Sequence, residues 1–238
     1  MKRLGLVVVS SDLTMETEFR EFLPYGVNLY VSRMPLRKFS PAGLARMEEE
    51  SMAAIDAIKD VRPDLIVYGC TSGSILEGKG YDAKIERKIT AATGIPSLTT
   101  AHAVVEYLEA LGVNDVEIAT PYTKDLDNLE KRFFTEHGFR VTQINGMGIS
   151  DDHILGTLEP QEISEFVMSH HDPAGAEAVF ISCTDLRVMS VLPSLRRRLN
   201  RPVFSSNLAT LWTVCQRLRL GRDNPLFDDY ENAEQPGR

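Results

Sequence analysis

The sequence predicts an α/β protein built from two similar lobes, each with a parallel sheet flanked by helices. Three observations support this prediction: strand-like apolar runs alternate with segments of helical spacing, the same landmarks recur half a chain later, and the composition is that of an ordinary globular protein. Of the 238 residues, 43% are hydrophobic and 25% are charged. That balance supports a substantial core and excludes a disordered or fibrous protein.

The first half of the chain alternates predicted strands with predicted helices. Strands are expected at residues 5–10 (GLVVVS), 64–68 (DLIVY) and 95–98, because short apolar runs bounded by turn residues are typical of strands buried on both faces. A helix is expected to begin at Ser40, as its N-cap, and Pro41, as its first residue. Further helices follow the second and third strands, and each is expected to end at a glycine.

The same order restarts in the second half. Strands are expected at residues 116–120 (VEIAT), 178–182 (AVFIS) and 202–205 (PVFS), and helices follow the first and the last of them. Counted from the matching landmarks in the first half, the offsets are 110, 113 and 106 residues. A recurrence at nearly constant spacing indicates an internal duplication, which predicts two similar lobes.

The duplication also predicts the domain organisation. We expect residues 1–98 and 208–221 to form the first lobe, residues 99–207 the second, and residues 222–238 a polar C-terminal tail. Ligand sites of parallel sheets lie beyond the carboxyl ends of the strands. The active site is therefore expected in the cleft between the two lobes.

A cysteine–threonine pair follows a predicted strand in each half, as Cys70 with Thr71 and as Cys183 with Thr184. A thiol between a strand end and a helix start has backbone N–H groups and the helix dipole available to favour its thiolate. A single cysteine in this place would be interpreted as a small buried residue. Its repetition at matched positions instead favours a pair of functional thiols. Cys215 lies on an apolar helical stripe and is expected in the core.

The turn after the first cysteine is small and rich in hydrogen-bond donors. The amides of Thr71, Ser72 and Gly73, with the hydroxyls of Thr71, Ser72 and Ser74, could receive a substrate carboxylate or a developing oxyanion. Residues 73–80 (GSILEGKG) approach a phosphate-binding loop, but Gly80 stands where a Ser or Thr would ligate magnesium. A nucleotide site is therefore disfavoured.

Charge and composition exclude several classes of function. The formal net charge is −8 and no long basic run occurs, so we expect neither nucleic acid nor a membrane as a partner. No apolar stretch approaches the roughly 20 residues of a membrane span, and the run at 4–9 is too short for a signal peptide. The three cysteines are odd in number and far apart, which favours the reducing cytoplasm. The histidines lack ligand spacing with the cysteines, so no metal is expected.

Five segments resemble a known family in the same order along nearly the whole chain. They are residues 10–19 (SSDLTMETEF), 69–74 (GCTSGS), 119–123 (ATPYT), 182–187 (SCTDLR) and 205–212 (SSNLATLW). With two lobes that each carry a Cys-Thr turn, they resemble the aspartate/glutamate racemase superfamily. Within it, the chain is most similar to maleate cis-trans isomerase and arylmalonate decarboxylase.

The resemblance implies roles for particular residues. Cys70 would be the nucleophile that adds to a substrate double bond, and Cys183 would assist by proton transfer. Tyr122 would donate a hydrogen bond to a substrate carboxylate, and Thr71 and Ser72 would belong to the carboxylate-binding turn. The family's decarboxylase has only the second cysteine, so the presence of Cys70 argues against that activity. No cofactor is implied.

Two positions depart from the isomerase pattern. Asp12 and Asp152 stand where that pattern has asparagine, whereas Asn207 is retained. An ionised Asp can only accept hydrogen bonds and would repel a carboxylate. If both side chains face the ligand, the substrate carries an ammonium or amide group at one end. The alternative is that they cap helices or point to solvent, since both precede helical segments.

These observations predict a cofactor-independent isomerase of a small carboxylate, similar to maleate cis-trans isomerase. The alternative is a two-cysteine racemase of an amino acid or diamino acid, of the kind whose relatives are encoded with ectoine-utilisation enzymes. A decarboxylase and a non-catalytic small-molecule binder on the same scaffold are further alternatives. We also expect a homo-oligomer, because closed homo-oligomers are common among such enzymes.

Overall fold

Two separate sheets of four parallel strands have the same strand order. The computed structural model describes residues 1–220 and Phe227, so the predicted tail at 222–238 lies outside the described residues except for the buried Phe227. The first sheet has the order β2-β1-β3-β4, with β1 (Lys2–Val9), β2 (Val27–Met34), β3 (Leu65–Gly69) and β4 (Ser97–Thr99). The second has the order β6-β5-β7-β8, with β5 (Asp115–Thr120), β6 (Arg140–Gly146), β7 (Ala178–Ile181) and β8 (Val203–Ser205).

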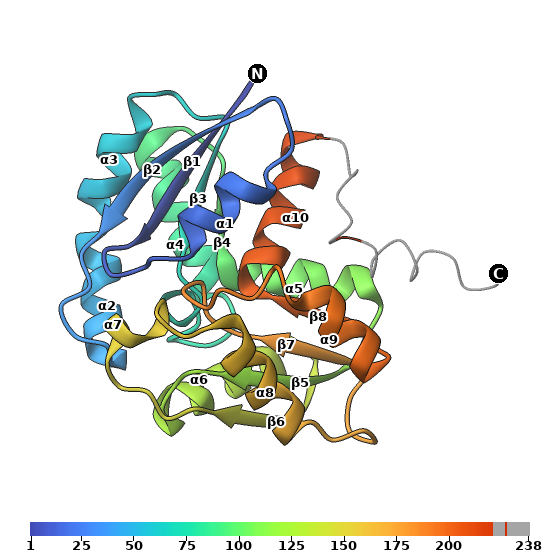
Figure 1. The fold of residues 1–238 in the computed structure, drawn as a ribbon. Coiled ribbons are helices and arrows are strands. Elements are labelled where there is room, and N and C mark those ends of the chain that lie inside the picture. Colours follow the sequence, from blue (N-terminus) through green and yellow to red (C-terminus); the bar gives the residue numbers. More distant parts are fainter. Residues whose placement is uncertain (221–226, 228–238) are drawn as a thin grey trace.

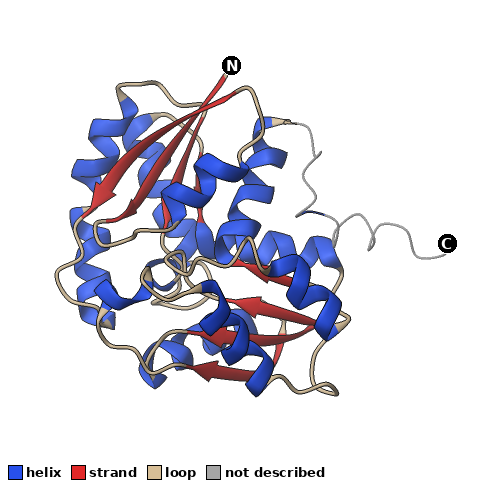
Figure 2. Ribbon diagram, in the orientation of Figure 1, coloured by secondary structure: helices blue, strands red, loops and turns tan. Residues whose placement is uncertain are grey.

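Helices surround each sheet, and this confirms the predicted two-lobed α/β fold (Figures 1 and 2). The first half of the chain contributes α1 (Met15–Phe22), α2 (Pro41–Glu50), α3 (Met52–Lys59), α4 (Tyr81–Thr93) and α5 (Thr100–Leu111). The second half contributes α6 (Lys124–Glu136), α7 (Asp152–Leu155), α8 (Pro160–His170), α9 (Leu192–Leu199) and α10 (Ser206–Leu218). None of the described helices combines the length and the apolar character that crossing a membrane requires.

The central strands are buried along most of their length, and the edge strands are not. Every residue of β3 and β7 is buried, as expected for strands covered by helices on both faces. Most residues of β2 and β6, at the outer edges, are partly exposed. These two strands, which the apolar runs did not predict, complete each sheet.

The helices that follow the last strand of each sheet meet between the lobes. The ring of Tyr107 on α5 lies 4.9 Å from that of Phe204 on β8 and 5.4 Å from that of Trp212 on α10. Although α10 follows the second sheet, it packs against α1 and β3 of the first (Figure 1). This apolar packing of α5 and α10 joins the two lobes.

Candidate active site

A pocket of about 340 Å³ lies where the carboxyl ends of the two sheets meet, and residues of both lobes line it. The predicted site residues in its lining are Asp12, Cys70, Thr71, Ser72, Tyr122, Asp152, Cys183 and Thr184. The rest of the lining consists of apolar side chains, Ser11 and an acidic residue that sequence reasoning did not select; these residues are Val9, Ser11, Leu36, Phe39, Leu44, Leu155 and Asp185. The predicted meeting of the two cysteine turns across one cavity is therefore observed.

Cys70 directly follows β3, and Thr71 connects it to a turn of 3₁₀ helix at Ser72–Ser74. Its Sγ accepts a hydrogen bond from the backbone N–H of Gly73 at 3.2 Å and lies 3.7 Å from Ser72 Oγ. Burial raises the pKa of this thiol to about 11, and the two donors act in the opposite direction. A Cβ at Gly73 would lie 2.9 Å from the sulfur, so glycine is what permits this close contact.

Cys183 follows β7 with a backbone φ of 133°, a conformation that L-residues rarely adopt. Its Sγ accepts the backbone N–H of Asp185 at 3.4 Å and interacts with the hydroxyl of Tyr122. Burial holds the pKa of this thiol well above its usual range, and the carboxyl of Asp185 raises it further. Cys183 therefore remains protonated and is suited to donate a proton.

Ser206, the first residue of α10, connects the two cysteine turns. Its Oγ accepts the hydroxyl of Thr71 at 2.9 Å and the backbone N–H of Cys183 at 3.1 Å. Sequence reasoning quoted this serine within the segment 205–212 and assigned it no role. Its position directly after β8 was the signal that could have identified it.

Tyr122 lies in the loop after β5 and its side chain reaches Cys183. It is 1% exposed, and its ring packs edge-on against Phe39 of the first lobe at 5.8 Å. Burial raises its pKa well above the usual value, so the hydroxyl stays protonated and can donate. The hydroxyl of Ser182 interacts both with Tyr122 and with the fully buried Glu130, whose pKa burial raises to about 8.

Asp12 lines the pocket and also accepts hydrogen bonds from backbone N–H groups at the start of α1. Its Oδ1 accepts the backbone N–H groups of Thr14 and Met15 at 2.9 and 2.8 Å. Its buried Oδ2 makes no hydrogen bond of normal geometry, and Thr184 is its hydroxyl neighbour. Burial raises the pKa of Asp12 above its usual value.

Asp185 is the second carboxyl in this part of the wall. Its Oδ1 accepts the backbone N–H of Leu13 at 2.7 Å, which connects the loop after β7 to the loop after β1. Burial and the charge of Asp12 raise the pKa of Asp185 to about 7. The two groups therefore disfavour each other's ionisation.

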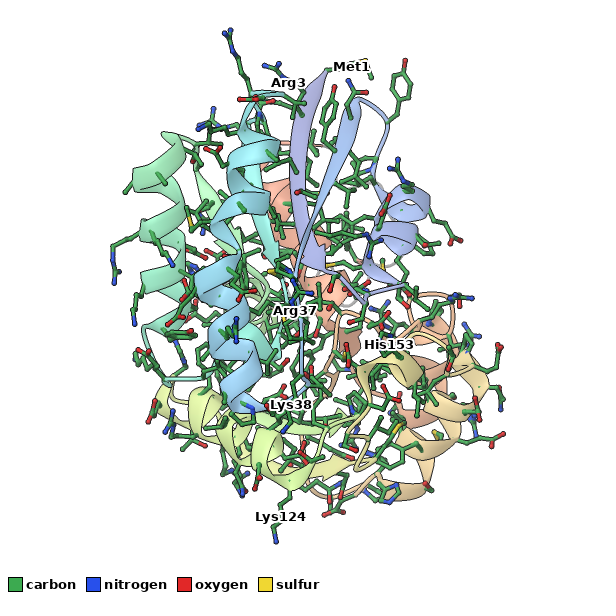
Figure 3. The ribbon with its side chains drawn as sticks, turned by 90° about the vertical axis from the view of Figure 1, so that its left-hand side faces the viewer. Met1, Arg3, Arg37, Lys38, Lys124 and His153 are labelled. Carbon is green, nitrogen blue, oxygen red and sulfur yellow. The ribbon has the colours of Figure 1, made fainter. Side chains whose placement is uncertain are left out.

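Asp152 lies at the start of α7 and lines the pocket, while its neighbour Asp151 caps the helix by accepting the N–H of His153 at 3.1 Å. In the described part of the chain, these three residues have ligand atoms within 4.8 Å of one another and could hold a metal ion. In Figure 3, His153 lies beside the junction of the lobes, and Arg37 and Lys38 lie along the same side. Both cations are exposed on the loop that carries the pocket residues Leu36 and Phe39.

Asn207 is the predicted site residue that the structure places outside the pocket lining. Its Nδ2 donates to Glu18 Oε2 at 2.7 Å and to the carbonyl of Thr184 at 2.8 Å. Glu18 in turn accepts the backbone N–H groups of Val188 and Met189 at 3.0 and 2.9 Å. Asn207 therefore positions the loop after Cys183, and its contact with a ligand stays a prediction.

Comparison with known proteins identifies the family of the chain. The family model for arylmalonate decarboxylase matches residues 4–225. The chain belongs to the arylmalonate decarboxylase family. The arylmalonate decarboxylase of Bordetella bronchiseptica is 29% identical over 143 residues, which cover 60% of each chain. Maleate isomerase of Geobacillus stearothermophilus is 27% identical over 232 residues, which cover 92% of each chain.

Solved structures of family members superimpose closely on this chain. A cysteine-to-serine variant of Nocardia farcinica maleate cis-trans isomerase, with a covalently bound succinylcysteine intermediate, has a TM-score of 0.90 at 26% identity. The match covers 94% of this chain and 96% of that one. Maleate isomerase from Pseudomonas putida S16 has a TM-score of 0.88 at 26% identity, with the same coverage.

Proposed function

We propose that this protein is a cofactor-independent isomerase that converts a small cis-enoic acid, with maleate as the reference substrate, into its trans isomer. The observation that carries the proposal is that Cys70 and Cys183, from equivalent turns of the two lobes, line one pocket in different electrostatic surroundings. The maleate isomerases described above support it, because they match this chain over nearly its full length.

The reactive form of the site holds Cys70 as a thiolate and Cys183 as a thiol. The Gly73 N–H and the Ser72 hydroxyl stabilise the charge on the Cys70 sulfur. The thiolate adds to one alkene carbon, and the electron pair of the double bond moves toward the carboxylate on the other carbon. Donors of the Thr71–Ser72 turn and the Tyr122 hydroxyl stabilise the resulting negative charge.

Cys183 completes the cycle by moving one proton. Its S–H donates to the α-carbon, which leaves a saturated adduct on Cys70 and a thiolate at Cys183. The former double bond is now single and rotates. Cys183 then removes the proton again, the C–S bond breaks, and the trans isomer leaves with both thiols in their starting states. The apolar side chains of Phe39 and Leu44 limit the access of water to the intermediate.

Proton NMR of the reduced protein with maleate tests the proposal. Formation of fumarate is expected, and Cys70→Ala abolishes it. Cys215→Ala is the matched control, because this cysteine is buried on α10 and does not line the pocket. The absence of isomerisation of both maleate and its half-amide, in protein whose Cys70 is reduced and reacts with iodoacetamide, would overturn the proposal.

A second candidate is racemisation of an amino acid, favoured by the two thiols together with the carboxyls of Asp12, Asp152 and Asp185 in the lining. In that reaction one cysteine removes the α-proton and the other returns a proton to the opposite face. Exchange of the α-hydrogen of amino and diamino acids for deuterium distinguishes it from addition and rotation. A non-catalytic binder gives neither exchange nor isomerisation.

We further propose that the enzyme works in the cytoplasm and as a homo-oligomer. All three cysteines are free and buried, which suits a reducing compartment. Closed symmetric assemblies are the commonest state of such enzymes. Light scattering of the purified protein tests the assembly, and fractionation of the native host tests the location.

A further inference from the structure

The pocket wall carries three carboxyl groups, which accept hydrogen bonds or share a proton. The carboxyls of Asp12, Asp152 and Asp185 all line it. Asp12 is 2% exposed and Asp185 is 5% exposed. Each already uses one oxygen, Asp12 for the amides at the start of α1 and Asp185 for Leu13.

The second oxygen of Asp12 has the hydroxyl of Thr184 as a neighbour. Asp12 Oδ2 is buried and makes no hydrogen bond of normal geometry, although a buried carboxylate oxygen ordinarily has a donor. A ligand group that donates a hydrogen bond would satisfy it. A second carboxylate is a poorer match, because the ionised carboxyls of Asp12 and Asp185 repel it and it could be bound there only by sharing their protons.

The nearby cations do not neutralise the carboxyl groups of the pocket wall. The described residues that line the pocket include no Lys, Arg or His. Arg33 is the cation whose charge reaches Asp12, but its guanidinium binds the backbone carbonyls of Ser10 and Asp12 and pairs with Glu16. The carboxyl of Glu18, packed behind Asp12, adds another acidic group.

Other groups of the lining can donate hydrogen bonds. The turn after Cys70 carries the backbone amides of Thr71 and Ser72, and the phenol of Tyr122 stays protonated. These groups suit one carboxylate of a substrate. The lining therefore contains donors for one part of a ligand and carboxyls for another.

We infer that the substrate carries one carboxylate and, at its other end, a nitrogen that donates hydrogen bonds to Asp12 and Asp185. This inference rests on the proposed function and specifies its substrate class. The half-amide of maleic acid has both kinds of group, a carboxylate for the Thr71–Ser72 turn and an NH₂ group for Asp12. The same donor chemistry is available in an ammonium group.

A comparison of substrates between the wild type and one isosteric variant tests the inference. NMR measures isomerisation of maleate, of maleamate and of the ammonium analogue cis-4-aminobut-2-enoate. We expect kcat/KM for maleamate or the ammonium analogue to exceed that for maleate by at least about tenfold, about 1.4 kcal/mol in transition-state binding. Asp12→Asn is expected to shift this preference toward maleate by about tenfold or more.

Asp12→Asn keeps the fold because an asparagine oxygen can still accept the N–H groups of Thr14 and Met15. Asp56→Asn, on the exposed surface of α3, is the matched control and leaves the preference unchanged. A wild type that prefers maleate, together with an unchanged preference in Asp12→Asn, would overturn the inference and leave the proposed isomerase in place.

A binding measurement separates failure of the inference from failure of the proposed function. The saturated analogues succinate and succinamate are compared for protection of Cys70 against alkylation by iodoacetamide. Stronger protection by succinamate, lost in Asp12→Asn, supports the inference even where no isomerisation occurs. Equal or stronger protection by succinate contradicts it whatever the enzyme's activity.

Discussion

The two cysteines follow equivalent strands in sheets of the same strand order, yet their turns are built differently. Cys70 is followed by a 3₁₀ turn, and its sulfur accepts an N–H and lies beside a hydroxyl. Cys183 has a positive φ and is followed by the acidic Asp185. Both sulfurs accept an N–H and lie beside a hydroxyl, but the second turn also places the carboxyl of Asp185 beside its sulfur.

The difference shows how a duplicated fold obtains two chemical roles. Burial raises the pKa of both thiols, but the value for Cys70 is about 11 while that of Cys183 is raised further by Asp185. The thiol that ionises more easily is the better nucleophile, and the other is the better proton donor. The equivalent positions of the two cysteines in the two lobes place both in one pocket. The residues that follow each cysteine then determine its chemical role.

The first prediction separates these two roles and has the largest expected effect. Cys70→Ala and Cys183→Ala each lower kcat/KM for the cis substrate by about 10³-fold or more, because each removes a group that makes or breaks a bond. They differ in the intermediate: Cys183→Ala still accumulates an adduct on Cys70, whereas Cys70→Ala forms none. Intact-protein mass spectrometry after incubation with maleate measures the adduct. An adduct on Cys183 in Cys70→Ala would reverse the assigned roles.

The second prediction concerns the residue that precedes each cysteine in the chain. Gly69 precedes Cys70, whereas Ser182 precedes Cys183 and interacts with the buried Glu130. Burial raises the pKa of Glu130 from 4.5 to about 8, so the folded protein binds a proton there that the unfolded chain releases. The free energy of unfolding therefore falls as pH rises from about 5 to 8, by up to about 1.4 kcal/mol per pH unit for one such group.

Denaturant unfolding at several pH values measures this slope. Glu18 and Asp185, with pKa values raised to about 7, contribute to the lower part of the range, so Glu130 is best isolated between pH 7 and 8. Glu130→Gln is expected to flatten the slope there, and the exposed Glu21→Gln leaves it unchanged. Stability that rises with pH in this window would contradict the neutral state of Glu130.

The third prediction tests the phenol that contacts Cys183. Tyr122→Phe removes a hydroxyl that lowers the pKa of Cys183 and is placed to donate to substrate. We expect about a tenfold to hundredfold loss in kcat/KM and slower alkylation of Cys183 at a given pH. Tyr25→Phe is the control, because Tyr25 is fully exposed. An unchanged rate of alkylation of Cys183 in Tyr122→Phe would contradict the assigned effect of the phenol on the pKa of Cys183.

The sequence was sufficient for the buried parts of the fold and insufficient for its edges. β3 and β7 are apolar runs because both faces of each strand are covered by helices. β2 and β6 escaped prediction because most of their side chains are partly exposed, so neither a continuous run nor a clear alternation marks them. The matching offsets predicted the duplication itself, and the shared strand order confirms it.

In the site, too, residues could be predicted where the signal lies next to them in the sequence, and could not where it depends on contacts between distant parts of the chain. Cys70 and Cys183 could be selected because each directly follows a recognisable strand. Asp185 could not, because its partner Leu13 is 172 residues away and only the folded chain brings them together. Asn207 is the converse case: its segment matched a family pattern and could be selected, but its hydrogen bonds to Glu18 and to the Thr184 carbonyl were not predictable from the sequence.

The last and smallest prediction concerns the helix starts that follow the two sheets. Thr100 begins α5, and its hydroxyl donates to the carbonyl of Tyr68 within the first lobe. Ser206 begins α10, but it accepts from Thr71 of the first lobe and from Cys183 of the second. Ser206→Ala leaves two buried donors without their acceptor, so we expect the free energy of unfolding to fall by about 1 to 3 kcal/mol.

The matched pair of variants separates stability from alignment of the thiols. Ser206→Ala is expected to lower kcat several-fold besides its effect on unfolding, because the backbone of Cys183 is no longer fixed to the Thr71 turn. Thr100→Val also removes a buried hydroxyl, yet it touches neither cysteine, so kcat is expected to stay within about twofold. Equal losses of kcat in the two variants would show that the link through Ser206 contributes stability alone, and that the two turns are aligned by the packing of α5 on α10.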